Sequence, residues 1–170
     1  MRRVTREAAG LLAELGLVPF AMTSGSRGFH LHVPLDRSLD FDDVRAFARD
    51  VARLLRGRSP DLLTVESRKD KRRGRIFIDV LRNGYAQTSV APYAVRARDG
   101  APVATPLNLS ELTRSELHPQ RYTLRNVFRR LARKGDPWET IDANARGLSE
   151  ARSELARLLE GSGLSERDAA

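Results

Sequence analysis

A thirteen-residue stretch, TSGSRGFHLHVPL (residues 23–35), places a turn rich in serine and glycine directly before two histidines. Backbone N–H groups, hydroxyls and the guanidinium of Arg27 would together suit the oxygens of a phosphate group. The alternation that follows puts His30 and His32 on one face of a strand and apolar residues on the other. The alternative is an ordinary hairpin loop with two packed histidines, which fits the same sequence. The stretch by itself therefore leaves a phosphate site and a plain turn equally open.

A single carboxylate, Asp79, interrupts the apolar run IFIDVL (residues 76–81), which predicts a buried strand. A carboxylate inside such a strand needs a cation or several hydrogen-bond donors beside it. A neighbouring arginine, Arg82 or Arg96, would supply the charge. The alternative is a divalent metal, Mg²⁺ or Mn²⁺, shared with substrate phosphates. A metal site for phosphoryl transfer normally uses two or more carboxylates, so Asp79 alone is not enough.

Two arginine-rich segments stand out in a chain whose formal net charge is +8. That charge favours a polyanionic partner such as nucleic acid. The first segment, RKDKRRGR, holds six basic residues in eight positions, among them Arg72 and Arg73. In the second segment arginines recur every four residues and would form one cationic stripe on a helix: Arg121, Arg125, Arg129 and Arg133. A solvated charged face is the alternative, but the two segments together favour nucleic acid.

The elements that would position these residues follow from the hydrophobic periodicity. Helices are predicted near residues 4–15, 44–55, 123–134 and 151–159. Strands are predicted near residues 18–23, 29–35, 62–66, 76–81 and 88–98, the first two joined as a hairpin. Asp40 is placed to cap the second helix, and residues 162–170 read as a polar tail. The apolar stripe of the third helix is Leu124, Val127, Phe128 and Leu131. This order predicts an α+β fold with a largely antiparallel or mixed sheet.

The overall composition narrows the class of protein further. A length of 170 residues suits one domain, and the absence of cysteine excludes a disulfide framework and thiolate zinc sites. No apolar run approaches the roughly 18 residues that a membrane span requires, and the start MRRVTREAAG lacks the apolar core of a signal peptide. We therefore expect a soluble cytoplasmic protein without a membrane partner.

Three stretches, in this order, closely resemble the polymerase domain of the bacterial ATP-dependent DNA ligase D family, a branch of the archaeo-eukaryotic primase superfamily. They are TSGSRGFHLHVPL, RIFIDVLRNGYAQTSVAPYAVRARDGAPVATPL and HPQRYTLRNVFRRLARKGDPW. The resemblance implies a primase-like polymerase domain over residues 1–140, followed by a C-terminal helix and tail over residues 141–170. It also implies two-metal nucleotidyl transfer that extends primers at DNA breaks during non-homologous end joining.

The resemblance further implies roles for individual residues. The residues that match nucleotide-binding positions of the family are Ser24, Gly25, Arg27, His30 and Arg96. His30 lies in the family's second motif, here Gly28-Phe29-His30, and the family match makes it a catalytic residue as well. Asp79 ends the third motif, which implies that it is catalytic and a ligand of Mn²⁺ or Mg²⁺. The implied DNA-binding residues are those of the two arginine-rich segments.

One motif of the family does not occur where it is expected. An Asp-x-Asp pair on a strand precedes the serine-glycine turn in the family, whereas here a predicted helix precedes that turn. Asp40 and Asp42 have the right spacing but follow the turn, where helix capping explains them. We therefore expect an incomplete domain that lacks its N-terminal part and two of its three metal-binding carboxylates.

Two functions remain open from the sequence. The first is a DNA repair polymerase or primase-like nucleotidyltransferase whose remaining portion lies elsewhere. The second is a degenerate, non-catalytic module that binds nucleic acid or nucleotide. The implied partners are DNA ends or a primer-template, nucleoside triphosphates, a ligase and end-binding repair proteins, and the implied location is the bacterial cytoplasm, at the nucleoid.

Overall fold

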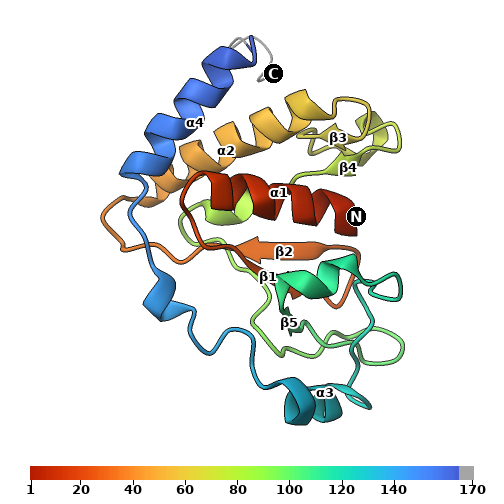
Figure 1. The fold of residues 1–170 in the computed structure, drawn as a ribbon. Helices are drawn as coiled ribbons and strands as arrows, with labels where there is room; N and C mark the ends of the chain where they lie inside the picture. The colour runs from red at the N-terminus through yellow and green to blue at the C-terminus, as the bar shows by residue number, and fades with distance from the viewer. Residues whose placement is uncertain (165–170) are drawn as a thin grey trace. The chain divides into compact units, whose positions relative to one another are not determined.

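The structure, a computed structural model, describes residues 1–164 and divides into two compact units (Figure 1). The first unit contains Met1–Asp36 and Val90–Arg146. The second contains Arg37–Ser89 and Gly147–Ala170, of which residues up to 164 are described. Residues 165–170 of the predicted polar tail lie outside the described residues. The described chain combines four α-helices with a small antiparallel sheet and a parallel strand pair, so the predicted α+β class is confirmed.

The first unit begins with helix α1 (Arg2–Glu14), as the periodicity predicts. Its buried side chains include Val4, Leu11 and Leu12, which recur at helical spacing. The helix ends before Gly16, whose φ of +77° is a conformation that glycine adopts without a steric penalty. Helix α1 contacts strand β2 and the 3-10 helix Leu109–Thr113.

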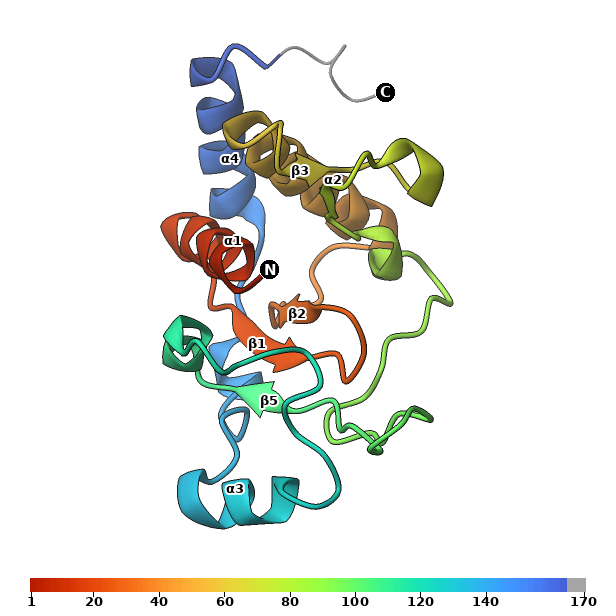
Figure 2. The same cartoon turned by 90° about the vertical axis from the view of Figure 1, so that its right-hand side faces the viewer.

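Three antiparallel strands form the sheet of the first unit, in the order β2-β1-β5 (Figure 2). Strands β1 (Phe20–Thr23) and β2 (Phe29–His32) are the predicted hairpin, with Phe20 opposite His32. Phe29 and Leu31 pack against buried apolar residues that include Leu107 and Leu112. The predicted separation of apolar and histidine faces is therefore confirmed.

The strand predicted for residues 88–98 is wrong. Residues 91–98 are mainly turns, with Val95 in an isolated bridge to Val103. The third strand is instead β5 (Pro106–Leu107), which the sequence analysis did not predict. Proline lacks a backbone N–H, and it is tolerated here because β5 lies at the edge of the sheet.

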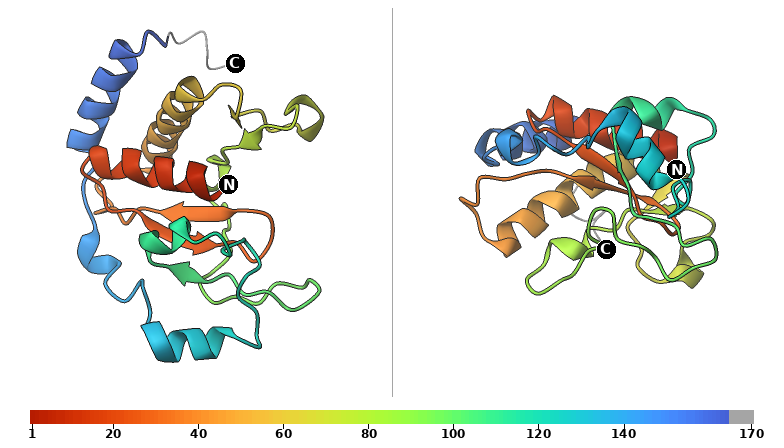
Figure 3. Two further views of the ribbon diagram at one scale, coloured as in Figure 1. Left: turned by 45° about the vertical axis from the view of Figure 1, so that its right-hand side comes forward. Right: turned by 90° about the horizontal axis from the view of Figure 1, so that it is seen from below.

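The second unit contains two packed helices, α2 (Phe41–Arg58) and α4 (Ser149–Gly161), which Figure 3 shows from two directions. Asp40 caps α2, because its Oδ1 accepts hydrogen bonds from the backbone N–H groups of Asp42 and Asp43, both at 2.9 Å. This geometry confirms that Asp40 belongs to a helix start. Buried apolar residues recur along both helices at the spacing that predicted them: Phe47, Val51, Leu54 and Leu55 of α2, and Ala151, Leu155 and Leu159 of α4.

The strand predicted for residues 76–81 is much shorter than expected. Strand β4 (Ile76–Phe77) pairs in parallel with β3 (Leu63–Thr64), and both of its residues are only partly buried. A 3-10 turn over Leu81–Asn83 follows shortly after β4. Across residues 1–164, no helix is long and apolar enough to cross a membrane.

Candidate nucleotide and nucleic-acid sites

Ser24 organises the serine-glycine turn through its side chain. Its Oγ accepts hydrogen bonds from the backbone N–H groups of Ser26 at 3.1 Å and Gly28 at 3.0 Å, and the Ser24 N–H donates to the Gly28 carbonyl. Three of the turn's backbone N–H groups are therefore engaged inside the turn and are not offered to a phosphate. Because a hydroxyl that accepts two bonds still carries its own proton, the Ser24 O–H remains a donor.

Arg96 lies directly against this turn. Gly25 has a φ of +62°, and a Cβ placed on it would stand 2.6 Å from Cγ of Arg96 and 3.2 Å from the backbone nitrogen of Ala104. The position of Arg96 is fixed by its backbone N–H, which donates to the Pro102 carbonyl at 2.8 Å. The fold thus brings together Ser24, Gly25 and Arg96, and it leaves Arg27 exposed in the same turn.

The two histidines of β2 are stacked, with ring centroids 6.0 Å apart and an angle of 30° between the rings. His32 also meets the edge of the Trp138 ring at a centroid distance of 4.8 Å, and its Nε2 is buried without a hydrogen-bond partner among the described residues. Burial, and to a smaller degree the neighbouring His30, lowers the pKa of His32 to about 4. His32 is therefore neutral at physiological pH and packs behind the partly buried His30.

Trp138 anchors the segment that lies behind these histidines, a role that the sequence analysis did not assign. Its Nε1 donates to the Ala21 carbonyl at 3.1 Å, and its ring packs edge-on against Phe20. Asp136 accepts from the Trp138 backbone N–H and from the Tyr93 hydroxyl, at 2.9 and 2.7 Å. Burial raises the pKa of Tyr93, and the bond to Asp136 raises it further. The signal available in the sequence was the single tryptophan, placed in GDPW.

Asp79 is exposed in the second unit, so the prediction of a carboxylate within a buried strand is wrong. Its Oδ1 accepts a hydrogen bond from the Leu81 backbone N–H at 3.1 Å, which starts the 3-10 turn. Within that unit Asp79 forms no ion pair with the described residues, Arg82 included. Across residues 1–164 no cluster of three or more His, Asp or Glu side chains could hold a metal ion. The described residues alone therefore do not fit a two-metal site.

The first arginine-rich segment is partly committed to its own loop. The Arg72 guanidinium donates to the carbonyls of Glu66 and Ser67, at 3.0 and 2.6 Å, and lies 4.1 Å above the Phe77 ring centroid. Arg73 is exposed in this loop, at a positive φ of 50°. Arg72 thus holds the loop in shape, and Arg73 presents its charge to solvent.

The second arginine-rich segment departs from the single helical stripe that was predicted. Helix α3 (Val127–Lys134) begins after Arg121 and Arg125, so only Arg129 and Arg133 belong to it. All four arginines are exposed, yet they do not form one helical row. The predicted apolar stripe is also wrong in part, because Leu124 and Phe128 are 46% and 70% exposed.

A buried ionic cluster explains how α3 is turned. Arg130 faces inward and donates to Oε2 of Glu111 at 2.7 Å, while Lys134 donates to Oε1 at 2.9 Å. The Tyr122 hydroxyl lies 3.1 Å from the same Oε1, and its ring lies beneath the Arg130 guanidinium. Burial alone would raise the pKa of Glu111, but the Lys134 hydrogen bond and the Arg130 charge together lower it. The sequence analysis missed this cluster.

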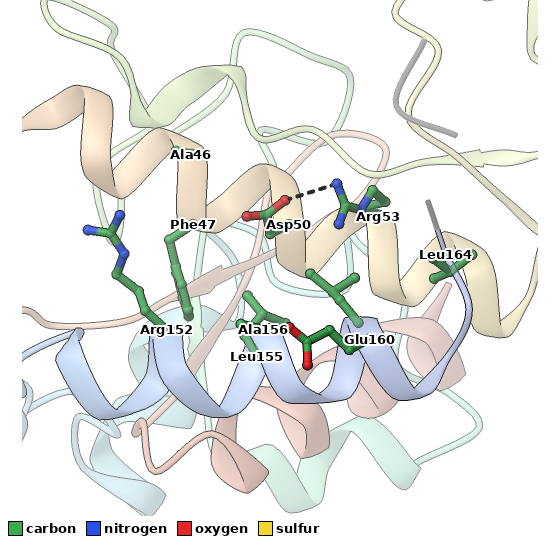
Figure 4. A pocket seen from close by; sticks show the side chains of 10 residues that line it. Ala46, Phe47, Asp50, Arg53, Arg152, Leu155, Ala156, Glu160 and Leu164 are labelled. Atoms are coloured by element: carbon green, nitrogen blue, oxygen red, sulfur yellow. Dashed lines mark ion pairs between the residues drawn. The ribbon is translucent and has the colours of Figure 1, made fainter. Parts of the chain in front are cut away.

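A hollow of about 450 Å³ separates the facing sides of α2 and α4 (Figure 4). Its apolar lining includes Phe47 and Leu155, and an ion pair between Asp50 and Arg53, 3.6 Å long, lies at its side. None of the predicted site residues lines this hollow.

The sequence and the fold can now be compared with known proteins. Residues 1–138 match the family model described as LigD, primase-polymerase domain. This chain belongs to the LigD primase-polymerase family. The resemblance recognised from the three sequence stretches is therefore confirmed.

Relatives within the LigD family include the multifunctional non-homologous end joining DNA repair protein LigD of Mycobacterium tuberculosis. It is 38% identical over 145 residues, which cover 85% of this chain and 19% of the relative. The LigD of Pseudomonas aeruginosa is 38% identical over 160 residues, which cover 92% of this chain and 19% of that protein. The chain thus spans about a fifth of the length of these relatives.

A solved structure supports the same family assignment. The polymerase domain of M. tuberculosis ligase D, in complex with DNA, aligns with a TM-score of 0.78 and 38% sequence identity. The alignment covers 85% of this chain and 50% of the solved chain. The fold described above is therefore that of a LigD polymerase domain over about half of the domain's length.

Proposed function

We propose that this chain is the nucleotide- and DNA-binding part of a DNA repair polymerase that acts in non-homologous end joining. Such an enzyme joins the 3′ hydroxyl of a primer to the α-phosphorus of a nucleoside triphosphate and releases pyrophosphate. Family membership and the DNA complex of the solved relative support the proposal. The single observation that carries it is the approach of Arg96 to Gly25, which brings the arginine side chain to the turn that Ser24 organises.

The triphosphate would bind at this turn. Arg27 and Arg96 would form charge-assisted hydrogen bonds with phosphate oxygens, and the Ser24 O–H would donate a further bond. His30 would contact the nucleotide. The neutral His32, which stacks with His30 and packs against Trp138, would limit the rotation of the His30 ring. A hydroxyl donor beside cationic donors suits the negatively charged oxygens of a triphosphate better than a neutral ligand.

DNA would bind through the exposed arginines of both segments. Arg73 in the second unit and Arg121, Arg125, Arg129 and Arg133 in the first present charges that phosphate contacts would neutralise. Arg72 would contribute mainly by shaping its loop, since carbonyls already take part of its hydrogen-bonding capacity. We extend the proposal to a ligase and end-binding repair proteins as partners, and to the bacterial cytoplasm at the nucleoid as location.

Mg²⁺ or Mn²⁺ would supply transition-state charge stabilisation in the complete polymerase. Asp79 is an isolated, exposed carboxylate among the described residues, so we assign to this chain the binding of triphosphate and DNA rather than metal-dependent transfer. That same observation favours the second candidate function, a module that binds nucleotide and nucleic acid without catalysis. The two candidates differ in whether carboxylates from outside residues 1–170 complete the site.

Primer extension distinguishes these candidates. With Mn²⁺, a primer-template and nucleoside triphosphates, we expect no incorporation by residues 1–170 alone. Addition of the half of the M. tuberculosis polymerase domain that this chain does not cover should restore incorporation, and Asp79→Ala should abolish the restored activity. Restoration establishes the polymerase; triphosphate and DNA binding without restoration establishes the binding module. Robust extension by residues 1–170 alone, lost in Asp79→Ala, would overturn our reading of the carboxylates.

A further inference from the structure

The orientation of α3 leaves an aromatic ring on a basic surface. Val127, Arg130 and Lys134 face inward, because Val127 is buried and the two cations bind Glu111. With 3.6 residues per turn, the opposite side of this eight-residue helix carries Phe128, Arg129, Ala132 and Arg133. The buried ion pairs therefore determine which side chains the helix presents to solvent.

Phe128 lies on this side of the helix with 70% of its surface accessible, and Leu124, just before the helix, is 46% exposed. Phe128 and Arg129 lie in the first turn of α3, and Leu124 and Arg125 lie in the turn that directly precedes the helix. Figures 1 and 2 show α3 beyond β5, with no other helix of the first unit alongside it. We call Leu124, Arg125, Phe128 and Arg129 the Phe128 surface.

The segment that carries this ring is strongly basic. Residues 121–135 contain six basic residues and no acidic residue. Glu111, which binds this segment from elsewhere in the chain, is buried and held by Arg130 and Lys134. Among residues 1–164, Arg125 and Arg129 form no ion pair and no side-chain hydrogen bond. Their guanidinium groups are consequently available to an anionic ligand beside an exposed aromatic ring.

We propose that the Phe128 surface binds single-stranded DNA, with one unpaired base stacked on Phe128 and the flanking phosphates on Arg125 and Arg129. The inference rests on the proposed DNA-binding function and deepens it by naming the form of DNA. An aromatic platform with adjacent arginines is the arrangement by which single strands bind without sequence preference. A duplex would use the arginines alone, since its bases are stacked and paired and cannot reach the Phe128 ring.

Binding of labelled DNA to the full chain, measured by fluorescence anisotropy, tests this proposal. Phe128→Ala should weaken binding of a short oligothymidine by about five- to tenfold and change duplex binding less than about twofold. Phe128→Trp should retain binding of the single strand. Tyr85→Ala is the matched control, because Tyr85 is an aromatic residue that is 79% exposed in the second unit. It should leave both affinities unchanged.

Two results would overturn the proposal, and each differs from failure of the proposed function. If Arg125→Ala with Arg129→Ala weakened DNA binding while Phe128→Ala left the single strand unaffected, the function would stand and the stacking role would be wrong. If Phe128→Ala weakened single strand and duplex equally, the preference for unpaired bases would be wrong. If the unsubstituted chain bound no DNA at low salt, the proposed function itself would be rejected. Binding of an acidic protein to this surface, without DNA binding, would also reject the proposed function. We expect the variants to keep the melting temperature of the unsubstituted chain, because Phe128 is exposed, and this result would exclude unfolding as the cause of weaker binding.

Discussion

Gly25 and Arg96 approach each other so closely that the chain has no room for a β-carbon between them. A Cβ on Gly25 would lie 2.6 Å from Cγ of Arg96, and the backbone there has a φ of +62°. Both the turn's conformation and the placement of the arginine therefore depend on glycine at this position. This relationship connects the hairpin turn to the segment after residue 90.

Gly25→Ala should lower both stability and triphosphate affinity. The left-handed backbone costs a side-chain residue about 1–2 kcal/mol, and the overlap with Arg96 and the Ala104 backbone adds to this cost. Gly16→Ala is the matched control, because Gly16 also has a positive φ, +77°, but nothing within 4 Å of the added Cβ. It should share the backbone cost and keep triphosphate affinity. Urea unfolding and titration calorimetry give both quantities; equal losses of affinity in the two variants would contradict a specific role of the close approach.

The stability of the chain should fall as the pH is lowered from 7 to 5. His32 has a pKa of about 4 in the folded state, against 6.5 when unperturbed. The unfolded chain therefore takes up a proton below pH 6.5 that the folded chain does not accept, and unfolding is favoured by up to about 2 kcal/mol at pH 5. His32→Phe should remove this part of the pH dependence, whereas substitution of the exposed His118 by glutamine should keep it. Urea unfolding at several pH values measures it, and an unchanged slope in His32→Phe would show that His32 is not the group responsible.

Removal of one partner from the buried ionic cluster should cost more than removal of two. Glu111→Leu leaves the Arg130 guanidinium buried without its carboxylate, which should lower the free energy of unfolding by about 3–5 kcal/mol. Adding Arg130→Leu should recover part of that loss, because no uncompensated buried charge remains. Asp70→Asn provides the control, since the Arg68–Asp70 pair is exposed and should contribute less than about 1 kcal/mol. A double variant less stable than Glu111→Leu would contradict this account.

Triphosphate binding and DNA binding should separate by mutation. Arg27→Ala with Arg96→Ala should weaken triphosphate binding, by about 1.5–3 kcal/mol for each charge-assisted hydrogen bond that the substitution removes, and affect DNA less. Arg125→Ala with Arg129→Ala should weaken binding to any DNA sequence and reduce the magnitude of the log–log salt slope by up to about two. Calorimetry with a triphosphate and anisotropy across a salt series measure the two effects. If all four arginines affected both ligands equally, the assignment of separate sites would be incorrect.

The sequence by itself determined the elements whose stability is local. Helix α1, the cap of Asp40 on α2 and the β1–β2 hairpin all lie where periodicity and turn chemistry place them. The same alternation correctly placed His30 and His32 on one face. Long, ordered matches also determined the family, because they extend over most of the chain. For the structural elements, the interactions that decide the outcome lie within a few residues of one another.

The tertiary structure alone decided which faces these elements present and which residues meet. The period of α3 is compatible with an inward Phe128, but Glu111, far away in the sequence, binds Arg130 and Lys134 and turns Phe128 outward. Strand β4 ends after two paired residues, so Asp79 is exposed although its neighbours read as a buried strand. Arg96 reaches Gly25 because the turns after residue 90 pair with residues 102–104, whose backbone also lies beside Gly25. The buried ion pairs and the contact between Gly25 and Arg96 join residues that are far apart in the sequence, and no local pattern of residues encodes such partners.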